Sequence, residues 1–382
     1  MRKVPELRFD GFEGEWEISR LGKISSKITK GTTPKEYGNG TVNFIKLENI
    51  NNTGNICPMT TISSEIHEGA LSRSILRDND ILLSIAGALG RVGIVKNNIL
   101  PANTNQALSI IRLFENYKAI FVFYYLRNGM LEKEINRIAT VGAQPNISLS
   151  QVGDFKINLP KPLEQEQIGD LFRKIDDLIE IQESKVSKME AFKKSMLQKM
   201  FPKKGELVPE IRFDGFDNYG FDKGKINDFI VTHGSKNYIK QPADVGTYKV
   251  IQQGDIPIAG YSNEEPYKDF SNVILFGDHT LSLFKPYEPF LLSTDGIKII
   301  FIENIDREYF YYLVQHVMPK SQGYKRHYKI LRSVKVNIPK SYKEQEKIGN
   351  FFKNLDSQIE NEERLLESYK MMKKSLLQKM FV

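Results

Sequence analysis

EQEQIGDLFRKIDDLIEIQESKVSKMEAFKKSMLQKMF, residues 164–201, returns as EQEKIGNFFKNLDSQIENEERLLESYKMMKKSLLQKMF, residues 344–381. The step from Glu164 to Glu344 and the step from Phe201 to Phe381 are both 180 residues, so no residue is inserted or lost between the two ends. The equal lengths and matched ends indicate that one rigid element has been duplicated.

The period of the apolar residues predicts that each copy is one long helix. These residues recur every three or four positions, which is the spacing of a helical stripe. Both copies lack proline and are rich in Glu, Lys, Gln and Leu, which favour helices. A helix of roughly 38 residues is about 57 Å long, which exceeds the core of a small domain. We therefore expect the two copies to bury their stripes against each other as a coiled coil.

The seam of this coiled coil is predicted to contain a polar residue at one matched position. A polar group at a seam position weakens the pair but fixes its register. The predicted seam consists of Ile168, Phe172, Ile175, Ile179 and Gln182 in the first copy and of Ile348, Phe352, Leu355, Ile359 and Glu362 in the second. The alternative is two unrelated surface helices, which the matched lengths and ends disfavour.

A second repeat precedes the first. The motif VPELRFDGF at residues 4–12 returns 204 positions later as VPEIRFDGF at residues 208–216. Each half of the chain thus reads as a leading motif, a variable region and a long helix, so the chain is an internal tandem duplication. The predicted division is a variable domain at 1–160, a long helix at 161–203, a second variable domain at 204–338 and a second long helix at 339–382.

Both variable regions show an α+β pattern, in which short β-rich runs alternate with turns rich in Gly and Asn. The first region is expected to form strands at 42–45, 81–85, 92–95 and 108–113 and a helix at about 117–137. The second is expected to form strands near 273–276 and 297–302 and a helix at about 306–317. Because Pro160 and Pro162 disfavour a helix in the residues before them, the first long helix is expected to begin near Leu163.

Composition indicates an ordinary globular protein with an anionic partner. The 382 residues leave room for two or three domains, and 40% hydrophobic with 26% charged residues is typical of soluble proteins. Apolar runs are short and the first residues lack the core of a signal peptide, so we expect a cytoplasmic protein without a membrane partner. A single cysteine and five scattered histidines argue against a disulfide framework or a metal site. The net charge of +7 favours an anionic partner.

The turns of the first variable region carry amide, hydroxyl and cationic side chains. Asn and Gln form bidentate hydrogen bonds with adenine, and Arg or Lys with guanine, while Thr and backbone amides hold phosphates. The alternative is that Asn and Gly occur there because turns favour them. The candidate DNA-binding residues of this region are Lys30, Thr32, Thr33, Lys46, Asn49, Arg91, Asn103, Asn105, Gln106, Gln144 and Asn146.

The second variable region carries a sharper signal in QGYKRHY, residues 322–328, where three basic residues interleave with two aromatic ones. Such a pattern is typical of nucleic-acid contacts. The alternative is a solvated charged turn before a strand. The candidate DNA-binding residues of this region are Lys236, Gln252, Gln253, Tyr261, Thr294, Gln322, Tyr324, Lys325 and Arg326.

Signatures of catalysis and of bound cofactors are absent from the sequence. The turn Gly87-Ala88-Leu89-Gly90-Arg91 lacks the Lys and the hydroxyl of a phosphate-binding loop. There is no glycine-rich dinucleotide fingerprint and no Asn-Pro-Pro or Asp-Pro-Pro run of an amino-methylating enzyme. The run from Glu344 to Lys347 imitates a nuclease motif, but it stands at a helix start, where acidic residues are favourable. We therefore expect no enzyme activity and no cofactor in this chain.

Together these features resemble the specificity subunit of type I restriction-modification systems, the HsdS family. The resemblance covers the whole chain and rests on the duplicated leading motif, the two dissimilar variable regions and the two helices that end in KKS-x-LQKMF. Trp16, Leu21-Gly22, the GTTP run at 31–34 and the run from Asp80 to Gly87 are similar to the pattern of the family's target recognition domains. The second region departs from this pattern, because it lacks the Trp and the Gly-x-x-Gly loop.

The resemblance implies two globular α/β target recognition domains joined by two long antiparallel helices that form a coiled coil with pseudo-two-fold symmetry. It implies a non-catalytic subunit whose domains each read one half of a split, asymmetric site in double-stranded DNA, with the helix pair setting the unread spacer. Two methyltransferase (M) subunits would supply S-adenosylmethionine and adenine methylation, and restriction (R) subunits would join for cleavage.

Two other classes of protein remain as alternatives. A stand-alone methyltransferase or nuclease predicts activity of the purified chain. A coiled-coil scaffold that binds proteins without DNA specificity predicts no salt-dependent affinity for duplex DNA. The missing catalytic motifs disfavour the enzyme, and the basic loops of two divergent domains disfavour the scaffold.

Overall fold

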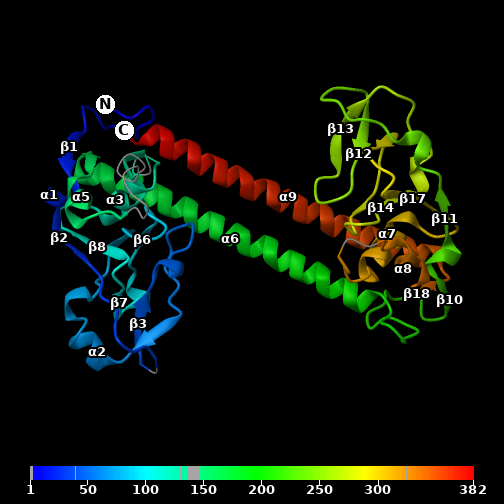
Figure 1. The fold of residues 1–382 in the computed structure, drawn as a ribbon, viewed down its shortest axis with the longest axis horizontal. Coiled ribbons are helices and arrows are strands. Elements are labelled where there is room, and N and C mark those ends of the chain that lie inside the picture. The colour runs from blue at the N-terminus through cyan, green and yellow to red at the C-terminus, as the bar shows by residue number, and fades with distance from the viewer. Residues whose placement is uncertain (1–2, 39, 130, 132, 136–145, 324–325) are drawn as a thin grey trace. The chain divides into compact units, whose positions relative to one another are not determined.

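The structure, a computed structural model, describes the chain except for residues 1–2, 39, 130, 132, 136–145 and 324–325 (Figure 1). The chain divides into two compact units: the first contains Met1–Glu183 and Leu365–Val382, and the second contains Ser184–Arg364. Each unit therefore holds one variable region, the first part of one long helix and the last part of the other. The sequence-based division instead treats the long helices as separate segments.

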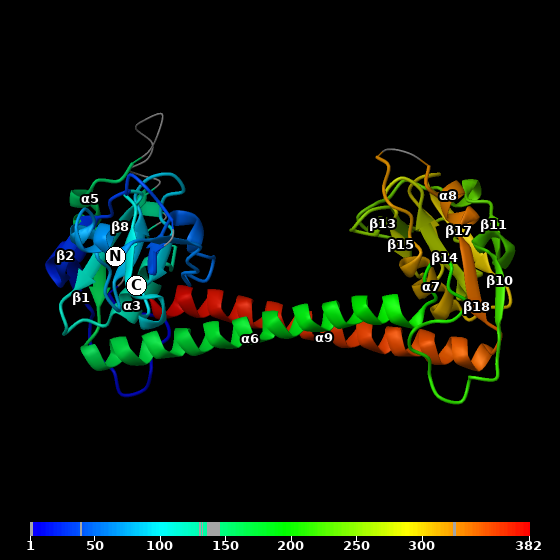
Figure 2. The same ribbon diagram turned by 90° about the horizontal axis from the view of Figure 1, so that it is seen from below.

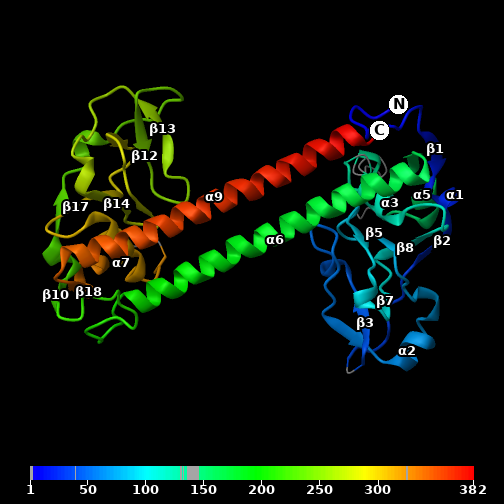
Figure 3. The same ribbon diagram turned by 180° about the vertical axis from the view of Figure 1, so that it is seen from behind.

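The two long helices are equal in length, as the repeat predicts. Helix α6 covers Pro162–Met200 and helix α9 covers Tyr342–Met380, 39 residues each. Each begins in one unit and ends in the other (Figures 1 and 3). Helix α6 begins one residue before the expected start, because a proline is tolerated in the first turn, where its missing N–H has no helical acceptor.

Ion pairs show that α6 and α9 run antiparallel inside each unit. The pairs are Asp176–Lys373 and Glu183–Lys370 in the first unit and Lys185–Glu362 and Lys193–Asp356 in the second. Residue numbers rise along α6 while those of the partners fall along α9, and the helix segments lie side by side (Figure 2). This arrangement confirms the predicted antiparallel helix pair.

All but one of the predicted seam residues are buried, and part of the stripe packs into a domain core. The buried ones are Ile168, Phe172, Ile175, Ile179, Gln182, Ile348, Phe352, Leu355 and Ile359. Glu362 is half-buried and accepts a hydrogen bond from Lys185. The ring of Phe172 lies 5.2 Å from that of Tyr124, and the ring of Phe352 lies 5.2 Å from that of Tyr312. Near its start, each long helix therefore packs against a variable region.

Two sheets form the described part of the first variable region. In the four-stranded antiparallel sheet the order is β2 (Ser25–Lys30), β8 (Leu108–Leu113), β5 (Ile81–Ser84) and β6 (Val92–Ile94). In the three-stranded sheet the order is β4 (Thr60–Ile62), β3 (Val42–Ile45) and β7 (Ala102–Thr104), and β3 runs parallel to β7. A separate pair joins β1 (Glu17–Arg20) to β9 (Lys156–Leu159). Ile, Val and Thr recur in these strands, where they pack well on a pleated surface.

The second variable region repeats this topology with other residues. Its four-stranded sheet has the order β11 (Ile230–His233), β17 (Ile297–Ile302), β14 (Val273–Gly277) and β15 (Leu283–Phe284). Its three-stranded sheet has the order β13 (Ile258–Ser262), β12 (Tyr248–Ile251) and β16 (Phe290–Leu292), again with the last two parallel. The pair β10 (Phe221–Lys225) and β18 (Lys335–Pro339) matches β1 and β9. The duplication therefore extends through the regions whose residues differ.

One helix of each variable region packs against a long helix. In the first unit this helix is α3, Ala119–Leu126, and in the second it is α7, Arg307–His316, which Asp306 caps by accepting from the N–H of Tyr309. The predicted helix at 306–317 is thus confirmed. The one predicted at about 117–137 ends at Leu126, before Gly129 with its positive φ of 88°, and helical residues return at Leu131 and 133–135.

A glycine in each long helix permits this contact. A Cβ at Gly169 would lie 2.4 Å from the Ile120 side chain, and a Cβ at Gly349 would lie 2.6 Å from the backbone N of Tyr309. Helices α3 and α7 therefore approach the long helices more closely than they could if a residue other than glycine stood at position 169 or 349. This explains why both copies have glycine at this position.

The end of each long helix completes the core of the unit in which the other long helix begins. Phe381, just after α9, packs against Phe121, Tyr125 and Phe172 in the first unit. Phe201, just after α6, packs in the second unit against the residues equivalent in position, Tyr309 and Phe352, and against His316. Each variable region is thus covered by residues from both copies of the repeated element.

The leading motifs are tied to the starts of the long helices by buried ion pairs. Arg8 binds both carboxylate oxygens of Glu164, at 2.7 and 2.8 Å, and Arg212 binds both of Glu344, at 2.6 and 2.8 Å. Both glutamates are 0% exposed. The hydrogen bonds from Arg212 raise its pKa, because Glu344 stabilises the charged form. The two repeats of the sequence therefore meet in space.

We expect Arg8→Ala to lower the free energy of unfolding by about 3–5 kcal/mol, because it leaves the Glu164 carboxylate buried without its partner. Urea unfolding followed by circular dichroism measures this effect. The matched control is Lys3→Ala, which removes the exposed Lys3–Glu15 pair and should cost less than about 1 kcal/mol. Equal losses in the two variants would contradict a structural role for Arg8.

Candidate nucleic-acid interface

The ends of four strands meet at one edge of the first unit. Strands β3 and β7 are parallel, so their ends are neighbours, and the Asn105 N–H donates to the Ile45 carbonyl at 3.3 Å. Strands β2 and β5 are antiparallel to β8, so their ends lie beside its beginning. The Ile147 N–H donates to the Ile85 carbonyl at 3.0 Å, which brings Asn146 to the same edge. We call residues 30–34, 46–49, 85–91, 105–107 and 146 the first loop cluster.

Most candidate residues of the first region reach this cluster with accessible side chains. They are Lys30, Thr32, Thr33, Lys46, Arg91, Asn105, Gln106 and Asn146, all exposed or half-buried. Thr33 and Gln106, which are far apart in the sequence, are joined by a hydrogen bond between their side chains. A Cβ at Gly31 would lie 2.1 Å from the Asn105 carbonyl oxygen, so the two loops are in direct backbone contact.

Two candidate residues of the first region have buried side chains, and a third uses part of its side chain to bind a backbone carbonyl. Asn103 is 0% exposed, and its amide nitrogen donates to the Leu71 carbonyl at 2.9 Å while its oxygen contacts His67. Asn49 is 3% exposed and accepts from the Lys46 N–H at 2.8 Å. These two amides are not accessible to a ligand, because they stabilise the backbone of the loops. The Arg91 guanidinium donates to the Ile50 carbonyl at 3.1 Å. Gln144 lies outside the described residues.

The second unit gathers its loops in the same way. The Ser293 N–H donates to the Ile251 carbonyl at 2.8 Å, which joins the ends of β16 and β12. Asp278, after β14, donates its N–H to the Gly296 carbonyl at 2.8 Å and accepts from the N–H of His327 at 3.0 Å and of Tyr328 at 2.7 Å. We call residues 234–236, 252–254, 278–282, 293–296, 322–323 and 326–327 the second loop cluster.

Most candidate residues of the second region belong to this cluster, and one does not. Lys236, Gln322 and Arg326 are exposed, and Gln252, Gln253 and Thr294 are half-buried. Tyr261 pairs with Lys249 on β12, at the opposite end of that strand from Gln252. It therefore lies on the sheet rather than in the loop cluster. Tyr324 and Lys325 lie outside the described residues.

The two clusters are equivalent in backbone position. The bond from His327 to Asp278 matches the bond from Ile147 to Ile85, since each acceptor is the first residue after the matching strand β14 or β5. Arg326 and Asn146 therefore occupy equivalent places, although the surrounding residues share no motif. The Tyr328 hydroxyl bonds to Thr232 at 2.6 Å, and burial raises its pKa, which keeps this phenol protonated.

Sequence reasoning missed Arg73. Its exposed side chain lies in a short turn, yet a guanidinium nitrogen is 3.4 Å from the Thr32 hydroxyl. A single basic residue in a turn gives no sequence signal of its own, because the contact with Thr32 depends on the fold. Together the clusters offer amides, hydroxyls and cations, the groups that contact bases and phosphates.

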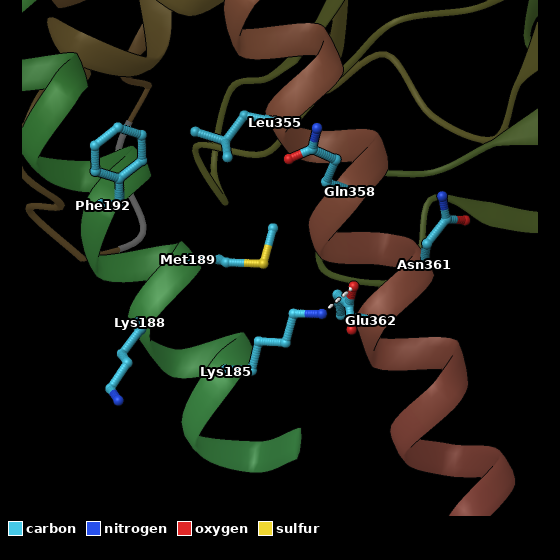
Figure 4. A pocket seen from close by; sticks show the side chains of 8 residues that line it. All are labelled: Lys185, Lys188, Met189, Phe192, Leu355, Gln358, Asn361 and Glu362. Atoms are coloured by element: carbon cyan, nitrogen blue, oxygen red, sulfur yellow. Dashed lines mark hydrogen bonds and ion pairs between the residues drawn. The ribbon is translucent and has the colours of Figure 1, made fainter. Parts of the chain in front are cut away.

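Other features of the described residues do not compete with the loop clusters as sites. An open groove in the second unit lies between α6 and α9, and the Lys185–Glu362 ion pair crosses it (Figure 4). Its lining residues all belong to the two helices and are Lys185, Lys188, Met189, Phe192, Leu355, Gln358, Asn361 and Glu362. The described residues contain no cluster of three or more His, Cys, Asp or Glu suited to a metal ion. None of the described helices is apolar over a length that would cross a membrane.

Comparison with known families gives a match over most of the chain. The family of type I restriction modification DNA specificity domains matches residues 13–191 and 218–370. Each matched segment covers most of one variable region and much of the long helix that follows it. The match is therefore duplicated in the same way as the sequence.

Curated relatives are specificity subunits. The chain is 29% identical to the EcoBI type I restriction enzyme specificity subunit of Escherichia coli over 163 residues. The aligned residues cover 41% of this chain and 33% of that protein. It is 26% identical to the MjaVIII specificity subunit of Methanocaldococcus jannaschii over 192 residues, and these cover 48% of this chain and 44% of that protein. The chain thus spans less than half the length of these two relatives. The putative MjaX specificity subunit of the same organism is 22% identical over 95% of this chain and 92% of its own length.

Solved structures show the same fold. The crystal structure of a type I restriction-modification system S subunit from M. genitalium superposes with a TM-score of 0.69 at 16% identity over 99% of both chains. A chain from a structure on complex assembly and conformational transition of the type I R-M system gives a TM-score of 0.55 at 16% identity, over 96% of this chain and 97% of that chain. This likeness confirms the predicted α+β architecture of two duplicated domains with long helices.

We expect Asn103→Ala and Gln106→Ala to separate structural from accessible amides. Asn103→Ala should lower the free energy of unfolding by about 1–3 kcal/mol, because buried polar groups lose their partner. Gln106→Ala should change it by less than about 0.5 kcal/mol, because the side chain is exposed. Chemical unfolding of both variants measures the difference, and a loss in Gln106→Ala as large as in Asn103→Ala would show that Gln106 is structural too.

Proposed function

We propose, on the premise that the chain belongs to the family of type I restriction modification DNA specificity domains, that each of its loop clusters reads one half of a split DNA site. The observation that carries this proposal is that the two units share one topology but differ in the residues of their loops. Both units have the same order of strands, whereas equivalent loop positions hold different residues, such as Asn146 and Arg326. Two readers built on one scaffold would therefore recognise two different base sequences.

The candidate contacts differ in chemistry between the two clusters. Gln106 and Asn105 of the first cluster present amides, which suit adenine, beside Lys30 and Arg73, which suit guanine or phosphate. Arg326 and Lys236 of the second cluster are exposed cations. Gln252 and Gln253 of the same cluster are half-buried, and their amides bind backbone groups, since Gln252 donates to the Ile256 carbonyl at 2.9 Å and Gln253 accepts from the His279 N–H at 3.2 Å. The net charge of +7 favours association of the whole chain with the DNA backbone. The alternative of a protein-binding scaffold without DNA specificity is not supported, since the matching family is one of DNA specificity domains.

Membership of the same family supports a proposal for the partners of this chain. We propose that two methyltransferase subunits bind to it and supply S-adenosylmethionine and adenine methylation, and that restriction subunits join for cleavage. The chain itself is then a non-catalytic subunit that chooses the site. A stand-alone enzyme is the weaker alternative, because neither cluster combines its amides and cations with the sequence signature of a catalytic loop.

Sequencing of adenine methylation in cells tests the proposal directly. A host that expresses this chain with its partner methyltransferase should show methylation at a split motif with two unlike halves and a fixed gap. Replacement of residues 17–159 by the corresponding region of another specificity subunit should change one half of the motif and leave the other half and the gap unchanged. A change in both halves, or a single undivided motif, would refute the assignment of one half-site to each domain.

The length of the helix pair should set the gap between the half-sites. Deletion of seven residues from each long helix, 181–187 and 361–367, shortens each by about 10.5 Å. This corresponds to about 3 base pairs of DNA. The same sequencing assay should therefore report unchanged half-sites with a gap shorter by about that number. An unchanged gap in a folded, active variant would refute this role of the helices.

A further inference from the structure

Each unit contains a contact among a buried tyrosine, an aspartate and a lysine from three different helices. In the first unit the Tyr124 hydroxyl of α3 donates to Oδ2 of Asp176 on α6 at 2.7 Å. Lys373 of α9 pairs with Oδ1 of the same carboxylate. Its Nζ also lies 5.6 Å from the centroid of the Tyr124 ring. A single carboxylate thus connects the variable region to both long helices.

The second unit repeats this contact with the helices exchanged. The Tyr312 hydroxyl of α7 donates to Oδ2 of Asp356 on α9 at 2.7 Å, and Lys193 of α6 pairs with Oδ1 at 2.6 Å. The Lys193 Nζ lies 5.6 Å from the centroid of the Tyr312 ring. In each unit the aspartate comes from the long helix that begins there, and the lysine comes from the one that ends there.

The tyrosine of each contact is buried and remains a hydrogen-bond donor. Tyr124 is 2% exposed and Tyr312 is 0% exposed. Burial raises the pKa of both phenols, and the neighbouring carboxylates raise it further, so both hydroxyls stay protonated and remain donors. The Lys373 and Asp176 side chains are 13% and 12% exposed, and those of Lys193 and Asp356 are 21% and 36% exposed. Hydrogen bonds to a charged acceptor are stronger than neutral ones. Each contact therefore holds its three helices in one arrangement.

We propose that these two contacts fix each recognition domain against the helix pair and thereby determine how strictly the protein enforces the gap between its half-sites. This inference rests on the proposed function. One additional base pair moves a half-site by about 3.4 Å and rotates it by about 35°. A domain must tilt on its helices to follow such a shift, and the Tyr–Asp–Lys contact opposes that tilt. The six residues are positioning residues, because they act through the domain and do not belong to the loop clusters.

The second unit supplies a matched control on the same helix. Tyr311 precedes Tyr312, and its hydroxyl donates at 3.5 Å to the carbonyl of Leu283, which lies within the variable region. Burial raises the pKa of this phenol to about 12. Tyr311→Phe therefore removes the same atom from a similar environment without releasing the domain from Asp356. If Tyr312→Phe has a larger effect than Tyr311→Phe, the difference is due to loss of the contact with the long helices.

The test uses the full chain assembled with its partner methyltransferase. Methylation rates are measured with S-adenosylmethionine on duplexes whose half-sites are separated by the native gap or by one base pair fewer or more. We expect Tyr124→Phe and Tyr312→Phe to raise the ratio of the rate at the altered gap to the rate at the native gap by about 2- to 10-fold, as the loss of one hydrogen bond implies. Tyr311→Phe should leave this ratio unchanged, and all variants should select the same half-site bases.

Two results would overturn the inference. One is a ratio that stays unchanged in both Tyr124→Phe and Tyr312→Phe, even if the rates at all gaps fall together, because this is what a purely structural role produces. The other is an equal rise in Tyr311→Phe. Failure of the proposed function gives a different result, in which the wild-type complex itself shows no methylation that depends on two half-sites.

Discussion

The end of each long helix packs into the core of the unit in which the other long helix begins. The rest of the structure depends on this constraint. Phe381 fills the core of the first unit beside Phe121 and Phe172, and Phe201 fills that of the second beside Tyr309 and Phe352. Neither variable region can complete its core with residues from its own half of the chain. The compact units consequently join residues 1–183 to 365–382 and leave 184–364 as the second unit.

Polar contacts reinforce this packing at equivalent points of the repeat. Gln165 donates to the Pro160 carbonyl and accepts from the Lys118 N–H, while Gln345 donates to the Pro339 carbonyl and accepts from the Asp306 N–H. These amides join the start of a long helix to the strand before it and to the helix that packs on it. The scaffold is thus specified by repeated residues, and the loops at the strand ends are left to vary.

Local patterns in the sequence predicted the elements well, because period and propensity act over short distances. Strands β8 and β17 have the expected bounds, since their Ile and Leu residues are bordered by clear turns. The pairing of Arg8 with Glu164 was beyond such reasoning, because it joins two repeats that are far apart in the chain. Residue type also failed to show direction: Asn103 and Gln106 both stand in a turn-rich segment, yet only Gln106 faces outward. The equivalence of Asn146 and Arg326 leaves no trace in the sequence, because only backbone hydrogen bonds define it.

The exchange of lysines between the halves has an evolutionary consequence. Lys193 is encoded in the first half of the chain but serves the second unit, and Lys373 is encoded in the second half but serves the first. A substitution near the end of one long helix therefore affects the stability of the domain that the other half of the chain encodes. Selection on that domain then acts on both helix copies together. The variable region is the part that can be inherited separately. A new one is compatible with the old helices if it brings a buried tyrosine to the aspartate and a helix that fits against the glycine.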